Sequence, residues 1–208
     1  MKYSINIIYH NDQMLARQAK NCLTTFDASF FDGTGYPSYS KVVNDCIMNS
    51  KEEIVIILNH KVRASPLDIY KMLHLIHKGY GLVMLRNFYF YGFKKDLIRK
   101  VGFLDERFVP GGCEDSDLVR RLVENNIAIY DSVEAQLMVM KNSWGDQSAS
   151  YEFFYKKWKD GKMERLLPDE IYDYDMGEYQ GTKFLGLEHT VWSKTNEDYF
   201  NSINFKFK

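Results

Sequence analysis

The chain has 208 residues, the length of one domain or of one domain with an appendage. Its 27 Lys and Arg residues nearly balance its 28 Asp and Glu residues, so the formal net charge of −1 provides no overall positive field to attract nucleic acid or an anionic membrane surface. With 45% hydrophobic and 26% charged residues, the composition excludes disorder, collagen and coiled coil as descriptions of the whole. We expect a single domain over residues 1–208, in which about 145–208, rich in aromatic and charged residues, form a C-terminal extension.

Neither the N-terminus nor the cysteines indicate secretion. The first eleven residues contain no apolar stretch as long as a signal peptide requires, and the longest aliphatic run, Ile54–Leu58, is far too short to span a membrane. Three cysteines, Cys22, Cys46 and Cys113, are odd in number and unclustered, which favours neither a disulfide framework nor a zinc site. We therefore expect a cytoplasmic protein without a transmembrane segment.

The first eighty residues alternate strand and helix patterns. A continuous apolar run predicts a buried strand at Tyr3–Tyr9, and apolar residues at helical spacing predict a helix at Tyr39–Asn49. In chain order the expected elements are strand Tyr3–Tyr9, helix Gln13–Lys20, strand Cys22–Phe26, loop Asp27–Ser38, helix Tyr39–Asn49, strand Glu53–Leu58 and helix Pro66–Lys78. This order is typical of right-handed βαβ units and a parallel sheet.

The second half mixes in antiparallel elements. Its expected strands are Gly81–Leu85, Phe88–Phe93, Ile127–Tyr130 and Glu134–Met140, and its expected helices are Asp96–Val101 and Glu114–Glu124. The fold class predicted from both halves is α/β, with a mixed, mostly parallel central sheet flanked by helices.

In an open α/β sheet, ligands bind beyond the carboxyl ends of the strands. That rule singles out four polar segments: His10–Asp12, Asp27–Thr34, Asn59–Arg63 and Gly111–Asp117. Carboxylates and amides there would suit a nucleotide base and ribose. Because Asp, Asn and Gly also fill loops for turn geometry alone, both interpretations stay open for the first two segments.

The segment Val101–Leu122 reads V-G-F-L-D-E-R-F-V-P-G-G-C-E-D-S-D-L-V-R-R-L. It resembles the inverting nucleotide-sugar glycosyltransferases of the GT-A fold, family 2 type, whose signature is G-x-F-D-E-x-F followed by G-x-E-D-x-D-L-x-x-R. The resemblance covers about Lys2–Ser143. Further matches are Asp27–Thr34 with the D-x-x-x-x-D-G-T donor loop, Asn44 with an Asn of the family, and Phe154–Trp158 with a late F-x-K-W element.

The resemblance implies transfer of a sugar from a nucleotide-diphosphate sugar, with a UDP-sugar favoured, to a hydroxyl of a glycan or other acceptor, with inversion, as in polysaccharide biosynthesis. Asp115 would be the general base and Glu114 would bind an acceptor hydroxyl, with Gly111, Gly112 and Trp158 around the sugar. We expect Asp117 to have a structural role in the first helical turn. The donor nucleotide would be bound by His10, Asn11, Asp27, Asp32, Asn44 and Asn59.

The metal-binding pattern of the family is absent. Its Asp-x-Asp, which holds Mn²⁺ or Mg²⁺ on the donor diphosphate, is matched here by Asn59-His60-Lys61, and the late His is missing from Val139–Asn142. A divalent cation is what the family would use, but its usual ligands are missing, so we predict no metal ligands. Lys61, helped by Arg63 and Lys141, would bind the diphosphate instead. The alternative is that Lys61 points to solvent or the site has decayed.

Rival functions remain open at this stage. A catalytically inactive GT-A module that binds a nucleotide or a sugar is the first alternative, because loss of the metal carboxylates with retention of the fold would produce one. A nucleotidyltransferase would need a Gly-rich phosphate loop after the first strand, and Tyr9–Gln13 lacks one. The net charge and the absence of a basic stripe disfavour a nucleic-acid binder, so we expect no nucleic-acid partner.

Overall fold

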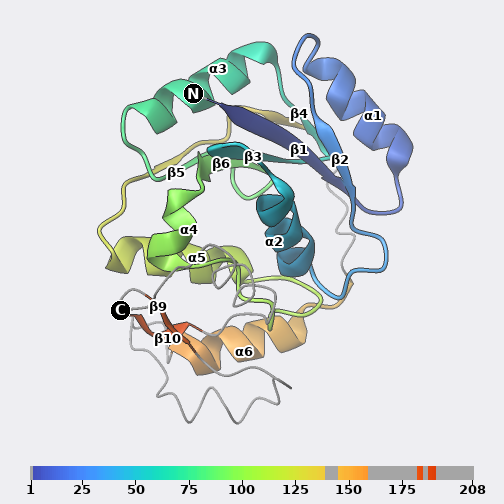
Figure 1. Ribbon diagram of the computed structural model, residues 1–208. Helices are drawn as coiled ribbons and strands as arrows, with labels where there is room; N and C mark the ends of the chain where they lie inside the picture. The colour runs from blue at the N-terminus through green and yellow to red at the C-terminus, as the bar shows by residue number, and fades with distance from the viewer. Residues whose placement is uncertain (1, 139–144, 159–181, 185–186, 191–208) are drawn as a thin grey trace. The chain divides into compact units, whose positions relative to one another are not determined.

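The protein is described here from a computed structural model, which describes residues 2–138, 145–158, 182–184 and 187–190 (Figure 1). The helices are α1 Gln13–Cys22, α2 Tyr39–Asn49, α3 Pro66–His77, α4 Asp96–Val101, α5 Glu114–Glu124 and α6 Ser148–Trp158. The strands are β1 Tyr3–Tyr9, β2 Ser29–Asp32, β3 Ile54–Asn59, β4 Val62–Arg63, β5 Leu82–Arg86, β6 Phe90–Lys94, β7 Ile129–Asp131, β8 Gln136–Leu137, β9 Thr182–Phe184 and β10 Leu187–Thr190.

The chain forms two compact units. The first comprises Met1–Tyr36, Val42–Leu97 and Asn126–Ser143, and the second comprises Pro37–Lys41, Ile98–Asn125 and Trp144–Lys208. Most of the C-terminal extension expected from about residue 145 lies outside the described residues, and its boundary stays a prediction.

A six-stranded sheet with the order β2-β1-β3-β6-β5-β7 lies in the first unit. β1 is parallel to both β2 and β3, and β5 is parallel to β7, whereas β6 runs antiparallel to β3 and β5. The predicted mixed, mostly parallel sheet flanked by helices is confirmed. Two short antiparallel pairs, β4 with β8 and β9 with β10, lie outside this sheet.

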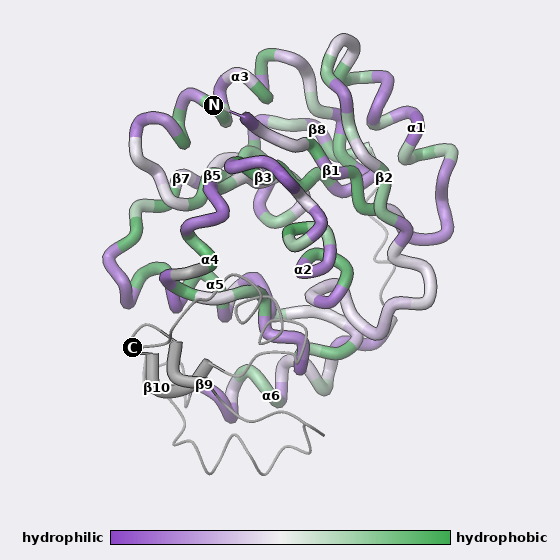
Figure 2. Tube along the Cα trace, viewed as in Figure 1, coloured by the Kyte–Doolittle hydropathy of each residue, from purple (hydrophilic) through white to green (hydrophobic). Residues whose placement is uncertain are grey.

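The core of the first unit lies between the sheet and two helices. Apolar side chains of β1, β3 and β5 alternate toward α1 and α3, which Figure 1 shows on one side of the sheet, with α2 on the other. Figure 2 shows the matching alternation of hydrophobic and hydrophilic residues along α1 and α3. A capping box fixes the start of α3, because Ser65 accepts from the backbone of Asp68 while Asp68 accepts from the backbone of Ser65.

The strand predicted at Cys22–Phe26 is wrong. α1 continues through Cys22, and the next strand, β2, begins only at Ser29. Ala16, Ala19 and Leu23 recur at i, i+3 and i+7 and are fully buried, so the helical period extends beyond Lys20, the predicted end of the helix. The strand therefore begins seven residues later than predicted. Its carboxyl end is at Asp32, not directly before Asp27.

The second unit is built on α5 and α6. Phe108 packs edge to face on Phe153 of α6, with ring centroids 4.9 Å apart, and the Ser150 hydroxyl donates to the Val109 carbonyl at 3.2 Å. In the described part of the chain, no helix combines the length and hydrophobicity needed to cross a bilayer.

Candidate functional site

Three loops meet at the carboxyl ends of β2, β1 and β3. The Gly33 N–H donates to the Tyr9 carbonyl at 2.7 Å, and the His60 N–H donates to the Ile8 carbonyl at 3.0 Å. The segments that follow the three parallel strands are thus joined by backbone hydrogen bonds. This edge of the sheet is where open α/β folds bind ligands, and we call it the donor edge.

On the donor edge, Asp32 and Asn11 are locked together through Thr34. The Thr34 N–H donates to Asp32 Oδ1 at 2.9 Å, while the Thr34 hydroxyl accepts from the Asn11 N–H and donates to Asn11 Oδ1, both at 3.2 Å. The hydrogen bonds from Thr34 lower the pKa of Asp32. Asp32 therefore presents an ionised, exposed carboxylate, which is an acceptor for ribose hydroxyls or the N–H groups of a base.

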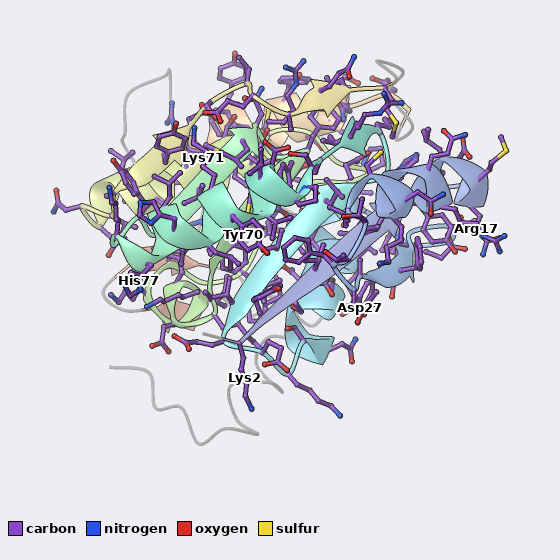
Figure 3. The ribbon with its side chains drawn as sticks, turned by 90° about the horizontal axis from the view of Figure 1, so that it is seen from above. Lys2, Arg17, Asp27, Tyr70, Lys71 and His77 are labelled. Carbon is purple, nitrogen blue, oxygen red and sulfur yellow. The ribbon has the colours of Figure 1, made fainter. Side chains whose placement is uncertain are left out.

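Asp27 lies away from the donor edge. It precedes β2, and because β2 is parallel to β1 and pairs Asn6 with Ser29 and Tyr9 with Asp32, Asp27 lies toward the opposite edge of the sheet from Asp32. The Phe26 ring packs against Tyr70 of α3, with centroids 5.3 Å apart; Figure 3 labels Asp27 and Tyr70 in one view. The expectation that Asp27 follows a strand is thus corrected: Asp32 has that position.

The carboxyl end of β3 is a tight, buried turn. The Lys61 N–H donates to Asn59 Oδ1 at 3.0 Å, and the Lys61 carbonyl accepts from the Met138 N–H at 2.7 Å. His60 Nδ1 lies 3.2 Å from the Ile8 carbonyl. Asn59, His60 and Lys61 are all buried, and burial lowers the pKa of both His60 and Lys61. The interpretation that Lys61 points to solvent does not fit this geometry.

The remaining residues predicted for the donor differ in their placement. His10 is half-buried at the end of β1 and lies beside Asn11, since the Asn11 amide is 3.3 Å from its ring nitrogen. Arg63 is exposed on β4. Asn44 is fully buried on α2, so it is not exposed to a nucleotide in this structure. Lys141 lies outside the described residues.

In the second unit, Glu114 opens α5 with a buried carboxylate. Its side chain accepts from the Gly112 backbone, yet Oε2 is buried without a hydrogen-bond partner among the described residues. Burial first, and then the charge of Asp115, raise the pKa of Glu114 to about 7. The Glu114 carboxyl therefore exchanges its proton close to neutral pH, where its protonated and ionised forms are both populated.

A strained loop leads into Glu114. Gly112 has φ of +101° and Cys113 has φ of +67°, a backbone region that favours glycine. A Cβ at Gly111 would lie 4.0 Å from both carboxylate oxygens of Glu114, and one at Gly112 would lie 3.0 Å from the Gln147 side chain. A side chain at Gly112 would therefore press on Gln147, and the positive φ of Gly111 and Gly112 disfavours other residues at both positions.

Asp115 has a different environment from Glu114. It is partly exposed in the first turn of α5, and its Oδ1 accepts from the Ser116 N–H at 2.7 Å. The positive end of a helix favours negative charge in its first turn. The two adjacent carboxyls therefore differ in chemistry, one buried and close to half-protonated at neutral pH, the other solvated.

Asp117 is neither a cap nor an exposed charge. It is fully buried, and it pairs with Lys157 at 2.6 Å and with Arg121 at 2.9 Å. Trp158 Nε1 donates to Asp117 Oδ1 at 2.8 Å. This agrees with a structural role, although through buried ion pairs rather than through the end of the helix.

Trp158 does not form a sugar platform. Its side chain is only 3% exposed, and the Arg120 guanidinium lies 5.4 Å from the centre of its ring. Sequence reasoning also missed a cluster of buried charges that includes Asp117, the hydrogen-bond partner of Trp158. We call this cluster the buried ion network: Asp105, Arg107, Asp117, Arg121 and Lys157. Several of these residues lie in the matched motifs, in the D-E-R of Asp105–Arg107 and in Lys157-Trp158, but the motifs alone do not show that these charges are buried and paired.

Comparison with solved structures identifies the fold. The chain is similar to a Drosophila β-1,4-galactosyltransferase 7 mutant in complex with manganese, UDP-Gal and xylobiose, with a TM-score of 0.55 and 6% sequence identity over 90% of this chain and 92% of that one. No family model and no curated protein sequence matches the chain. The similarity shows a GT-A glycosyltransferase fold, whereas membership of family 2 stays a prediction.

The metal of such transferases does not fit the residues present here. At the carboxyl end of β3 the side chains are an amide, a buried imidazole beside the Ile8 carbonyl, and an ammonium, which has no lone pair for a metal while protonated. Among the described residues, no group of three or more His, Cys, Asp or Glu side chains is arranged to hold a metal ion. We therefore derive no step through a divalent cation.

Proposed function

We propose that the protein is a glycosyltransferase that moves a sugar from a nucleotide-diphosphate sugar, a UDP-sugar by preference, to a hydroxyl of a glycan acceptor with inversion. The observation that carries this proposal is the adjacent carboxyls Glu114 and Asp115 opening α5 behind a glycine loop, in a chain with the GT-A fold. The donor edge of the sheet supports it, since its polar groups suit a nucleoside.

On the donor edge, the nucleoside would contact His10, Asn11 and Asp32. The Asp32 carboxylate, held by Thr34, accepts from the ribose hydroxyls or from an N–H of the base. The Asn11 amide supplies a donor and an acceptor beside it. Asn59 contributes by shaping the turn after β3, because its side-chain oxygen is bonded to the Lys61 N–H.

In the reaction, an acceptor oxygen attacks the anomeric carbon as the bond from that carbon to the diphosphate oxygen breaks. The hydroxyl proton passes to Asp115, and the bonding electron pair leaves with the nucleoside diphosphate. Attack from the face opposite the leaving group inverts the anomeric centre. Asp115 suits the base because it is partly exposed and accepts a proton during attack.

Glu114 suits a binding role in the same step. Its buried, unpartnered oxygen accepts a hydrogen bond from an acceptor hydroxyl, and its pKa of about 7 means that the carboxyl also donates one when protonated. An acceptor hydroxyl that hydrogen-bonds to Glu114 Oε2 removes the free-energy cost of leaving this buried oxygen unpaired, and this favours binding of the acceptor.

The test is transfer by the Asp115→Asn variant. Loss of a general base should reduce transfer by about 10²-fold or more while the affinity for UDP, measured by calorimetry, stays unchanged. Glu152→Gln, which neutralises an exposed carboxylate on α6, is the matched control and should retain wild-type turnover. Near-wild-type turnover in Asp115→Asn would remove this residue from the mechanism. A wild-type protein that binds UDP-sugars yet transfers nothing to any acceptor would instead be a binding module.

A further inference from the structure

The turn after β3 fixes the backbone of a lysine, Lys61, at the donor edge. Both backbone groups of Lys61 are bonded within the first unit, the N–H to Asn59 Oδ1 and the carbonyl to the Met138 N–H. Lys61 as a whole is only 6% exposed to solvent. The position of this lysine is therefore set by the fold, unlike that of a lysine on an open surface.

Lys61 belongs to the same edge as the groups assigned to the nucleoside. It follows β3 by two residues, and Asn59 is in register with Ile8, one residue before Tyr9, which is itself in register with Asp32. Burial lowers the pKa of His60, the charge of Lys61 lowers it further, and the charge of Asp12 raises it, so charges of both signs lie near the end of β3. Lys61 supplies a positive charge among the groups that follow the strands.

Burial makes this ammonium a strong site for an anion. Removing an ammonium from water costs free energy, and burial lowers the pKa of Lys61 for that reason. A phosphate oxygen placed beside it in a partly dry site interacts more strongly than it would in water. In glycosyl transfer the diphosphate gains negative charge as the sugar leaves, so the interaction is strongest when the bond is breaking.

We propose that Lys61 is the resident cation that binds the diphosphate of the donor, so that nucleoside diphosphates bind to this protein without a divalent metal ion. The inference rests on the proposed function and assigns a part of the same site. A divalent metal ion would be expected in this fold, but the side chains at the end of β3 are the amide of Asn59, the imidazole of His60 and the ammonium of Lys61. The inference follows from this mismatch.

The experiment measures binding of UDP and of uridine to the full chain in excess EDTA, by calorimetry for UDP and by saturation-transfer NMR for uridine. We expect UDP to bind wild type in EDTA, and Mn²⁺ to leave the affinity unchanged. Lys61→Met, which keeps the length of the side chain but not its charge, should weaken UDP by about 10- to 100-fold and leave uridine unchanged.

Two further variants keep the test decisive. Lys61→Arg retains the charge and should bind UDP in EDTA far better than Lys61→Met does. Lys78→Met removes an exposed lysine just after α3 and should bind both ligands as wild type does. Circular dichroism of each variant checks that the fold is retained.

Three results would overturn the inference: UDP binding by wild type that is lost in EDTA and restored by Mn²⁺, equal UDP affinity in wild type and Lys61→Met, or parallel loss of UDP and uridine in that variant. Each of these leaves the proposed function standing, because a nucleotide still binds. Absence of binding of uridine, UDP and UDP-sugars to wild type, with or without Mn²⁺, would contradict the proposed function itself.

Discussion

Asp32 and Asp27 form a natural pair for a test at the scale of single residues, because Asp32 ends β2 whereas Asp27 precedes the strand. Asp32→Ala removes the carboxylate that Thr34 orients on the donor edge, so UDP binding should weaken by about 1–3 kcal/mol. Asp27→Ala, at the other edge, should leave the affinity unchanged. Calorimetric titration of both variants decides between them. A loss confined to Asp27→Ala would show that the nucleoside is bound elsewhere.

Glu114 predicts a dependence of stability on pH. Its pKa rises from an ordinary 4.5 to about 7 on folding, so between these values the folded protein keeps a proton that the unfolded chain has released. Its stabilising contribution is complete below pH 4.5 and is lost as the pH rises through 7. Relative to Glu114→Gln, the free energy of unfolding of wild type should therefore fall by roughly 3 kcal/mol over this interval.

Urea unfolding of the two proteins at a series of pH values from 4 to 8 measures this difference. Glu114→Gln is a suitable reference because the amide keeps the shape of the side chain and never ionises. Curves for wild type and variant that stay parallel across the interval would show that the carboxyl titrates as it does in the unfolded chain.

Between elements, the buried ion network fixes α5 against α6. Burial alone would raise the pKa of Asp105, but the charges of Arg107 and Lys157 hold it well below its usual range. Lys157 contacts Asp105 at 2.7 Å and Asp117 at 2.6 Å, and so bridges two segments of the second unit. Asp117 lies in the first turn of α5 together with Glu114 and Asp115, so the network acts on the same helical turn as these two carboxyls.

Removing one member of this network should be costly. Asp117→Asn leaves two buried cations, Arg121 and Lys157, without their shared carboxylate, and should lower the free energy of unfolding by about 3–5 kcal/mol. Glu152→Gln breaks the exposed pair of Glu152 with Lys156 and should cost at most about 0.5 kcal/mol. Equal, small losses in the two variants, measured by denaturant unfolding, would mean that water reaches the network.

The accuracy of sequence reasoning also varied by element. Strongly periodic or capped segments such as Tyr39–Asn49 and Pro66–His77 were predicted almost to the residue, because burial on one face and Pro66 after Ser65 define a helix locally. β2 was misplaced because only two of its four residues are hydrophobic, Phe30 and Phe31, and its pairing with β1 is a tertiary property. The misplaced strand put Asp27 directly after a strand, so it was assigned to the donor alongside Asp32, although only Asp32 lies at the carboxyl end of β2.

At the scale of the whole molecule, the sequence predicted which residue types belong to the candidate site, but it did not predict which of those side chains are buried. The carboxyls that open α5 and the lysine after β3 were found from their motifs, because spacing along the chain preserves those. The burial of Trp158, Asn44 and Asp117 could not be read from spacing, since it depends on segments far apart in the chain, such as α6 packing on residues 105–110. The motif match therefore predicts which residues form the candidate site, but it does not predict that Trp158 is buried.

The charge balance of the whole chain leads to a last prediction, on salt. The 27 basic and 28 acidic residues nearly cancel, so no long-range positive field assists binding of an anionic nucleotide. Under the proposal, the attraction comes from nearby groups such as the buried Lys61. Mobile ions screen exposed charges beyond about 10 Å at 0.1 M salt, but they screen buried contacts far less. The dissociation constant of UDP should thus rise by less than about tenfold between 50 and 500 mM NaCl. Calorimetry in EDTA across this range is the measurement, and a much steeper loss of affinity would show that UDP is held by exposed basic side chains such as Arg63 rather than by a buried cation.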